Sequence, residues 1–541
     1  MERAFNLLDE PWICVRLPDC QIQEVNLRDA LLRSHEYTEL AGETKAQDFA
    51  ILRLLLAVMY TVFSRYGLQG EEITLSEDPD LAADQWEDIW RSGSIPAKPV
   101  ERYLNEWHDR FWLFDDAHPF YQSKAVEGKS KPISTAKMIG TLFESANKKR
   151  LFSERQEQGR DLTFAEAARW LLHLNCFDDI AAKQPTPKKT WAGKLGLIAL
   201  KGNTLFETLL FNYCAEQDGM QGVFTSTPAW EQDNNTSEFN RIIAVPDNQA
   251  ALLSLQSRRI LLCKQNDHVT GYYLSGGDYF EEEELFQTEM MTLWRGNQEK
   301  KNDPYHYKPR LYNPARRLWQ EFGSIAVLNE SNSDKTKAPG VILHYNQLIR
   351  NKSISRDVPV RVSAASVIYD YKQSTSLPVI DTISDSLTFH AQLLQEAGSE
   401  WRVLIQDEIS RCEDAAKAVY HLYKDLQKAN GRRDKDGKTE QSGELDARTE
   451  FYERIDRPFR LWLAALDPEQ ADRIDYPQEL ERQLRDIALR FGNELAAQSD
   501  SAAIFGRYLK EQGEITSSAA ALNQFTYQIR KKIFTRAGDK S

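Results

Sequence analysis

Two segments rich in lysine and arginine flank an apolar helix pattern in a chain that is otherwise acidic. Residues 147–160 contain five Lys or Arg and two Glu, and residues 183–201 contain five Lys and no acidic residue. The whole chain carries a formal net charge of -13. Basic side chains gathered in two short loops of an acidic protein can bind a polyanion such as nucleic acid. The alternative is that both segments are solvated surface loops.

The second basic segment contains the motif Gly193-Lys194-Leu195-Gly196. A glycine lets the backbone approach a phosphate closely, and neighbouring lysines supply positive charge. A GxxG motif clamps backbone phosphates in one RNA-binding fold, but the motif alone is too short to indicate that fold. The same residues also fit a simple turn from a loop into a strand. Both interpretations stay open at this point.

The usual motifs of enzymes are absent from the sequence. There is no GxxxxGK[ST], no GxGxxG after a predicted strand, and no GxSxG that would indicate an activated serine. His108-Asp109 is a single dipeptide without the further His and Asp that a metal phosphohydrolase needs. The residues from Asp115 to His118 precede Pro119 in a pattern that favours a capped turn over a metal site. We therefore predict no catalytic residue, no metal and no cofactor.

Length, cysteine spacing and hydropathy predict a soluble protein of two or three domains. The chain has 541 residues, more than a single core usually serves, and its six cysteines are scattered without a CxxC motif, which fits a reducing cytosol. The N-terminus lacks the pattern of a signal peptide. Phe49 to Phe63 is the most apolar run, but it is too short to span a bilayer and contains Arg53. We expect a cytoplasmic protein without a membrane partner.

Helices and strands alternate in the part of the chain that must position the basic segments. Strands are expected at residues 12–17, 22–26, 241–245, 252–263, 268–274 and 359–371. Helices are expected from Leu27 with Asn26 as the N-cap, and at 46–66, 162–177 and 204–213. Residues 295–317 contain three prolines and seven Lys or Arg against two acidic residues, and we expect a long loop there.

The sequence changes to helix patterns from Asp381 onward, without a strand signal. One predicted helix face carries apolar residues at spacings of four and three, at Ile405, Ile409, Cys412, Ala416, Val419, Tyr423 and Leu426. Three more helix patterns lie near residues 451–466, 480–497 and 519–534. Four amphipathic helices joined by loops predict a helical bundle. The expected fold class is α+β, with a large mixed α/β N-terminal domain that has antiparallel sheet elements (residues 1–382) and a C-terminal four-helix bundle (residues 383–541).

Six segments carry a resemblance to a known family. They are FNLLDEPWI (5–13), ELAGETKAQDFAILRLLLAV (39–58), FAEAARWLLHLNCFDD (164–179), LFETLLFNY (205–213), PAWE (228–231) and LQSRRILL (255–262). They resemble the large subunit of the type I-E CRISPR Cascade complex, the CasA family. The resemblance is densest before Trp319, and in the bundle only helix count and length agree.

The resemblance implies a non-catalytic subunit at one end of a crRNA-guided antiviral surveillance complex. Such subunits recognise the protospacer-adjacent motif (PAM) of duplex DNA through the minor groove and wedge the duplex open for R-loop formation. They also help to recruit a separate helicase-nuclease. The expected partners are the other Cascade subunits with crRNA, double-stranded target DNA and that nuclease. Protein would read a short motif while base pairing reads the rest, and minor-groove readout predicts a promiscuous PAM.

The resemblance also assigns roles to individual residues before the middle of the chain. Leu151, Phe152 and Ser153 occupy the loop that contacts the crRNA end and a neighbouring subunit. The glycine-rich PAM loop of the family falls near residues 185–196, where this chain reads PTPKKTWAGKLG. Prolines and lysines stand where glycines are expected, so the lysines can act on phosphates instead. The DNA-binding candidates in this loop are Lys188, Lys189, Gly193, Lys194 and Gly196.

Two further features of the family fall later in the chain. Its lysine finger lies in the segment 295–308, where Lys300, Lys301 and Lys308 are the candidates. Its wedge hairpin matches the turn after the predicted strand 359–371, so that Gln373 is the wedge and Lys372 its neighbour. A glutamine there can hydrogen-bond freed base edges while its stem prevents restacking.

Two other functions remain as alternatives. The first is a scaffold that binds crRNA and protein partners with little direct PAM reading. The second is a metal-dependent nuclease, which cleavage of nucleic acid with magnesium or manganese would reveal. The net charge of -13 favours a subunit embedded among proteins over a free DNA-binding protein, which is usually basic.

Overall fold

The structure is a computed structural model in which the chain forms two compact units. It describes residues 3–73, 75, 81–129, 131–139, 160–178, 189–214, 227–233, 238–281, 285–300, 303–326, 335–369, 379–431, 447–509 and 514–534. The first unit comprises Met1–Tyr312, Val327–Ser355 and Arg361–Ser386. The second unit comprises Asn313–Ala326, Arg356–Val360 and Leu387–Ser541. The domain division expected between residues 382 and 383 stays a prediction.

The chain opens with the hairpin that the sequence predicts. Strands β2 (Ile13–Arg16) and β3 (Ile22–Val25) pair antiparallel, with Ile13 opposite Val25, and β4 (Glu39–Leu40) adds to the other edge of β2. Asn26 caps helix α1 (Leu27–Leu32), because its side-chain oxygen accepts a hydrogen bond from the Asp29 amide at 2.7 Å.

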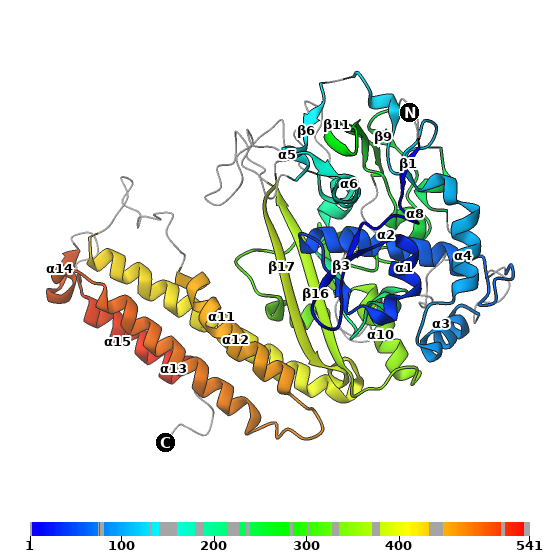
Figure 1. The fold of residues 1–541 in the computed structure, drawn as a ribbon. Coiled ribbons are helices and arrows are strands. Elements are labelled where there is room, and N and C mark those ends of the chain that lie inside the picture. Colours follow the sequence, from blue (N-terminus) through cyan, green and yellow to red (C-terminus); the bar gives the residue numbers. More distant parts are fainter. Residues whose placement is uncertain are drawn as a thin grey trace. The chain divides into compact units, whose positions relative to one another are not determined.

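Helix α2 (Lys45–Phe63) runs through the core of the first unit (Figure 1). Its N-cap Thr44 accepts a hydrogen bond from the amide of Gln47, and the helix packs on α6 (Phe164–Phe177) and α8 (Gln249–Leu253). Among the described residues, α2 alone is long and apolar enough to cross a membrane, and it is wholly buried inside the protein. A helix that is apolar all round is typical of a protein core, which agrees with the prediction for this segment.

An antiparallel sheet in the first unit centres on β10 (Arg258–Gln265) and β11 (His268–Gly276). Both β6 (Ile133–Ser134) and β7 (Leu162–Thr163) pair with β11. The predicted strand at 252–263 is therefore wrong in its first part. Leu252 and Leu253 are the last two residues of helix α8. The Asn248 side chain caps the start of that helix by accepting a hydrogen bond from the Ala251 amide at 2.8 Å.

A second sheet has the strand order β17-β16-β8 and consists of β8 (Leu197–Leu200), β16 (Pro359–Tyr369) and β17 (Val379–His390). Figure 1 shows β16 and β17 as two long neighbouring strands. The expectation of pure helix after Asp381 is wrong at β17, which is rich in polar residues, among them Asp381, Ser384 and Ser386. Pairing with β16 decides the conformation of such a strand.

A third sheet replaces the first part of the long loop expected at 295–317, and residues 310–317 form no helix or strand. Strands β13 (Trp294–Asn297) and β14 (His306–Pro309) form an antiparallel hairpin, and β15 (Thr336–Lys337) pairs with β13. The other α-helices and strands among the described residues of the first unit are β1 (Ala4–Asn6), β5 (Trp112–Phe114), β9 (Arg241–Ile242), β12 (Asp278–Tyr279), α3 (Leu81–Ser92), α4 (Ala97–Glu106), α5 (Thr135–Met138), α7 (Leu205–Asn212) and α10 (Gly340–Arg350).

The second unit contains the predicted helical bundle. Its long helices are α11 (Ser399–Ala429), α12 (Ala447–Ala465), α13 (Tyr476–Ala497) and α15 (Ser518–Gln528), which lie side by side in Figure 1. The apolar stripe of α11 is buried at Ile405, Ile409, Cys412, Ala416, Val419 and Leu426. The unit also contains α9 (Phe322–Ile325), α14 (Ser501–Phe505) and the hairpin β18 (Arg507–Leu509) with β19 (Glu514–Thr516), which the helix-only expectation missed.

Candidate nucleic-acid interface

The second basic segment, residues 183–201, includes strand β8, and its described residues before that strand, 189–196, form the lysine loop. The amide of Gly196 donates to the carbonyl oxygen of Arg310 at 2.8 Å, just after β14. The hydroxyl of Thr292, just before β13, donates to the carbonyl oxygen of Gly196 at 2.9 Å. These two bonds attach the lysine loop to the open end of the β13–β14 hairpin, where the chain enters β13 and leaves β14. About 100 residues separate the two segments in the sequence.

The end of strand β16 lies against the same loop. Ala365 of β16 is opposite Leu197, and the Ser366 hydroxyl donates to the carbonyl oxygen of Leu195 at 3.5 Å. The ammonium nitrogen of Lys189 lies 4.9 Å from the centroid of the Tyr369 ring, which is a cation–π contact. Tyr369 ends β16, so the strand that leads to the predicted wedge turn adjoins the lysine loop.

Both glycines of the GxxG motif are buried against this chain's own atoms. A Cβ atom on Gly193 would clash with the Tyr369 hydroxyl and would lie 2.6 Å from the Thr190 hydroxyl. A Cβ atom on Gly196 would lie 2.5 Å from the carbonyl oxygen of Arg310. Their lack of a side chain therefore allows the lysine loop to pack against β16 and against the hairpin. DNA contact by Gly193 and Gly196 stays a prediction.

The β13–β14 hairpin presents basic side chains in register. Arg295 and Lys308 are directly opposite each other and both are exposed. Like charges at opposed positions of two strands repel each other. Lys300 is exposed near the turn, where its amide donates to the Asp303 carboxylate at 3.0 Å. Sequence reasoning missed Arg295, because only the register places it beside Lys308.

Several predicted site residues lie outside the described part of the chain. They are Leu151, Phe152, Ser153, Lys188, Lys301, Lys372 and Gln373. The described candidates Lys189, Lys194, Gly193 and Gly196 belong to the lysine loop, and Lys300 and Lys308 belong to the hairpin. The structure thus joins two of the predicted segments and the strand that leads to a third.

A buried ion pair secures the helix that precedes the lysine loop. Asp178, the C-cap of α6, accepts from the guanidinium of Arg258 at 2.6 Å, and both side chains are 3% exposed. Arg258 also donates to the Tyr279 hydroxyl at 2.8 Å. Burial by itself would lower the pKa of Arg258, but the Asp178 carboxylate, together with Tyr279 and Tyr369, outweighs burial and raises that pKa above its ordinary value.

The carboxylate of Asp115, in the sequence pattern before Pro119, has partners within the protein. Asp115 accepts from the backbone amides of Ala117 and His118 at 2.7 Å each, in a capped turn as the sequence favours. Burial would raise the pKa of Asp115, but these amides and Arg3 lower it below its usual range. Across the described ranges, no group of three or more His, Cys, Asp or Glu is arranged to hold a metal ion.

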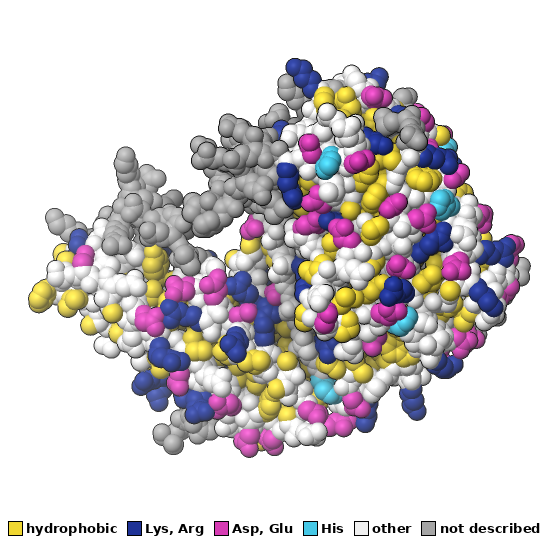
Figure 2. Space-filling model, viewed as in Figure 1, with side chains coloured by type: hydrophobic (Ala, Val, Ile, Leu, Met, Phe, Trp, Pro, Cys, Tyr) yellow, Lys and Arg dark blue, Asp and Glu magenta, His cyan; other side chains and the backbone are white. Residues whose placement is uncertain are grey.

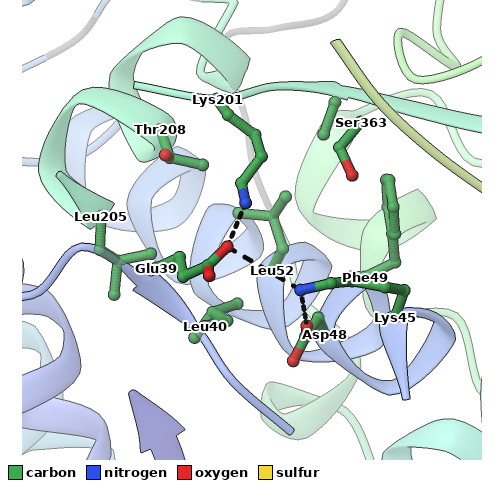
Figure 3. A pocket seen from close by; sticks show the side chains of 11 residues that line it. Glu39, Leu40, Lys45, Asp48, Phe49, Leu52, Lys201, Leu205, Thr208 and Ser363 are labelled. Carbon is green, nitrogen blue, oxygen red and sulfur yellow. Dashed lines mark hydrogen bonds and ion pairs between the residues drawn. The ribbon is translucent and has the colours of Figure 1, made fainter. Parts of the chain in front are cut away.

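A small pocket lies at the other end of β8, between α2, β4 and α7 (Figure 3). Its volume is about 40 Å³, room for only a few water molecules. Lys201 forms an ion pair with Glu39, and Lys45 forms one with Asp48 at 3.0 Å. Burial would raise the pKa of Glu39, but Lys201, Lys45 and Arg16 together outweigh burial and lower that pKa. Since its charges are paired within the wall, this pocket is not a candidate ligand site.

A comparison with known families decides the family of the chain. The family model of "CRISPR-associated protein Cse1" matches residues 6–491. The chain belongs to the Cse1 (CasA) family. A CasA/Cse1 protein of Thermus thermophilus is 32% identical over 235 residues, which are 42% of this chain and 42% of that relative.

Solved structures agree with this membership of the Cse1 family. The crystal structure of Thermobifida fusca Cse1 has a TM-score of 0.78 at 25% identity and covers 98% of both chains. That likeness confirms the predicted fold class, a mixture of helices and antiparallel sheets with a helical C-terminal region. A chain of a solved CRISPR RNA-guided surveillance complex has a TM-score of 0.67 at 16% identity, covering 98% of this chain and all of that one, and so shares the Cse1 fold.

Proposed function

We propose that this chain is the large subunit of a CRISPR RNA-guided surveillance complex of the Cascade type, where it recognises the PAM of duplex DNA. Membership of the Cse1 family supports the first part, as does the fold shared with a chain of a solved CRISPR RNA-guided surveillance complex. Its partners are then crRNA and the other Cascade subunits, in the cytoplasm. The chain acts by binding, and cleavage of DNA belongs to a recruited helicase-nuclease.

The observation that carries the DNA-binding part is the meeting of three segments in the first unit. The lysine loop is hydrogen-bonded to the β13–β14 hairpin and packs against the end of β16. Lys194 and Lys308 then contact phosphates and set the position of the duplex, whereas groove contacts read the motif. Gln373, beyond the end of β16, is the proposed wedge that holds the separated strands apart.

The scaffold function is the second candidate, and charge distribution favours it. On the face shown in Figure 2, Lys and Arg side chains are interspersed with Asp and Glu. With a net charge of -13, the chain by itself is a weak general binder of DNA. In a scaffold, crRNA and neighbouring subunits would supply most of the affinity, and loss of the lysines would leave DNA binding intact.

The experiment is a gel-shift titration of the crRNA-loaded complex on PAM-bearing and PAM-scrambled duplexes at several salt concentrations. Omission of this chain is expected to abolish the preference for the PAM duplex. The double variant Lys194→Ala/Lys308→Ala is expected to weaken binding about tenfold. It is also expected to make the negative slope of log affinity against log salt shallower by about 2, since two phosphate contacts are lost.

The matched control is Lys98→Ala, which removes an exposed lysine of α4 in the same unit. It is expected to leave affinity and slope unchanged. If the complex binds both duplexes alike with and without this chain, PAM recognition lies elsewhere and the scaffold function replaces it. If the double lysine variant behaves like Lys98→Ala, these two lysines do not contact the duplex.

A further inference from the structure

A buried carboxylate lies behind the lysine loop, at Glu289. Its two oxygens each accept a hydrogen bond from the guanidinium of Arg53 in α2, both at 3.0 Å. The side chains of Arg53 and Glu289 are 2% and 0% exposed. A bidentate pair of this kind fixes the orientation of the carboxylate as well as its position.

The same carboxylate reaches the lysine loop through a tryptophan. The indole nitrogen of Trp191 donates to Oε2 of Glu289 at 2.8 Å. Trp191 is buried, and the centroid of its ring lies 4.8 Å from the centroid of the Phe280 ring. It is also the N-cap of the 3-10 helix Ala192–Lys194. The Trp191 side chain is therefore held in place directly before the backbone that carries Lys194 and Gly196.

Glu289 also stands just before the strand that begins the hairpin. The amide of Met291 donates to Oε1 of Glu289 at 3.2 Å, and the carbonyl oxygen of Met291 accepts from the amide of Ile198 in β8 at 2.8 Å. The chain then continues through Thr292 into β13. One carboxylate thus contacts the core helix, the lysine loop and the segment that enters the hairpin.

Stability alone is a poor explanation for this arrangement. Desolvation of a buried ion pair offsets most of its Coulomb attraction, and apolar residues of similar size often serve as well. The carboxylate instead fixes how its neighbours are oriented, because its oxygens accept hydrogen bonds from Arg53, from Trp191 and from the amide of Met291. Its position is set by α2, the most deeply buried helix of the unit.

We propose that Glu289 is a positioning residue that holds Trp191 and thereby fixes the lysine loop relative to the β13–β14 hairpin. The consequence for DNA rests on the proposed function: Lys194 and Lys308 meet the phosphates of one duplex only if loop and hairpin keep this spacing. Glu289 itself does not contact the duplex, since it is completely buried.

The test uses Trp191→Phe, because removal of Glu289 would leave Arg53 as an unpaired buried charge and the protein could fail to fold. Phenylalanine keeps an aromatic ring and loses the indole N–H. The matched control is Trp86→Phe, which loses a similar bond from a buried indole to the Leu210 carbonyl oxygen at 3.0 Å in the same unit.

The first measurement is hydrogen exchange of the full chain. The amides of Lys194, Leu195 and Gly196 are hydrogen-bonded in the structure and report on the loop. Trp191→Phe is expected to raise their exchange about tenfold, as for the loss of one hydrogen bond. Trp86→Phe is expected to leave them unchanged. Absence of a local increase in Trp191→Phe would overturn the proposal.

The second measurement is the gel shift of the crRNA-loaded complex on the PAM duplex. Trp191→Phe is expected to weaken binding several-fold with an unchanged salt slope, because the bound state keeps the same phosphate contacts. The double lysine variant makes the salt slope shallower, so the slope distinguishes the loss of a phosphate contact from a change in the position of the loop. If the lysine variant weakens binding and Trp191→Phe does not, the proposal is overturned. If the lysine variant has no effect, the two lysines do not contact the duplex, and the exchange result alone decides whether Glu289 positions the loop.

Discussion

The two glycines of the lysine loop allow its backbone to pack closely against neighbouring segments. Gly196 brings the lysine loop to within hydrogen-bond distance of the hairpin, since its amide reaches the Arg310 carbonyl oxygen at 2.8 Å. On the other side of the loop, Gly193 leaves room for Tyr369 and Thr190. Without a Cβ atom at these two positions, the lysine loop, the hairpin and the end of β16 pack together.

Substitution of Gly196 by alanine tests this packing. Its Cβ would lie 2.5 Å from the Arg310 carbonyl oxygen and 3.0 Å from the Tyr312 ring, so backbone must move. We expect Gly196→Ala to lower the free energy of unfolding of the first unit by about 1–3 kcal/mol, measured by urea denaturation.

Gly67→Ala is the control for that substitution. There the new Cβ meets only the carboxylate end of the exposed Glu71 side chain, which can rotate away. The expected change is within about 0.5 kcal/mol. Equal effects of the two substitutions would show that the contact at Arg310 does not constrain the loop.

At the scale of elements, α6 leads the chain toward the lysine loop, and both of its ends are fixed. Thr163 and Glu166 form a capping box at its start, where the Glu166 amide donates to the Thr163 hydroxyl at 3.2 Å and the Thr163 amide donates to the Glu166 carboxylate at 2.9 Å. Asp178 ends the helix in its buried pair with Arg258. The hydroxyl of Thr190 returns to the helix by donating to the Cys176 carbonyl oxygen.

Removal of the cap is expected to weaken this element by a predictable amount. Thr163→Ala should lower the free energy of unfolding of the first unit by about 1 kcal/mol, because the amide of Glu166 loses its acceptor. Thr163→Ser keeps the hydroxyl and should remain close to the wild type. Urea denaturation of both variants measures the difference, and an alanine variant as stable as the serine variant would contradict the capping role.

At the scale of the whole molecule, the chain has two compact units with separate cores. The second unit is built on apolar stripes of α11, α12, α13 and α15, with Leu484 and Phe451 completely buried. The first unit contains the lysine loop, the hairpin and the network around Glu289. We therefore expect the two cores to respond separately to damage in one of them.

Leu484→Ala is the variant that tests this independence. Loss of a fully buried leucine is expected to cost about 2–5 kcal/mol. Hydrogen exchange in denaturant should show the loss in α11, α12, α13 and α15 and not in α2 or α6. Leu461→Ala, at a position of α12 that is 59% exposed, is the control and should change little. A loss of equal size in α2 would mean that the two units unfold as one.

Local patterns were sufficient to predict much of the fold. The Asn26 cap, the hairpin β2–β3, helices α2 and α6, and the bundle helices follow from caps and apolar periodicity within a few residues, which neighbouring side chains decide. The concentration of lysines in residues 183–201 was also evident from the sequence. The family resemblance predicted three DNA-binding segments.

Contacts between distant segments were decided only by tertiary structure. The hairpin β13–β14 was expected to be a loop, because the pairing of Arg295 with Lys308 depends on register and leaves no periodic pattern among prolines and charges. Strand β17 was missed because pairing with β16 outweighs its polar composition. Glu289 and Arg53 are 236 residues apart, so no local pattern links them. The sequence by itself thus determined most of the helices, the first hairpin and where positive charge lies. The tertiary structure decided which distant segments lie together, because only folding removes the distance along the chain between them.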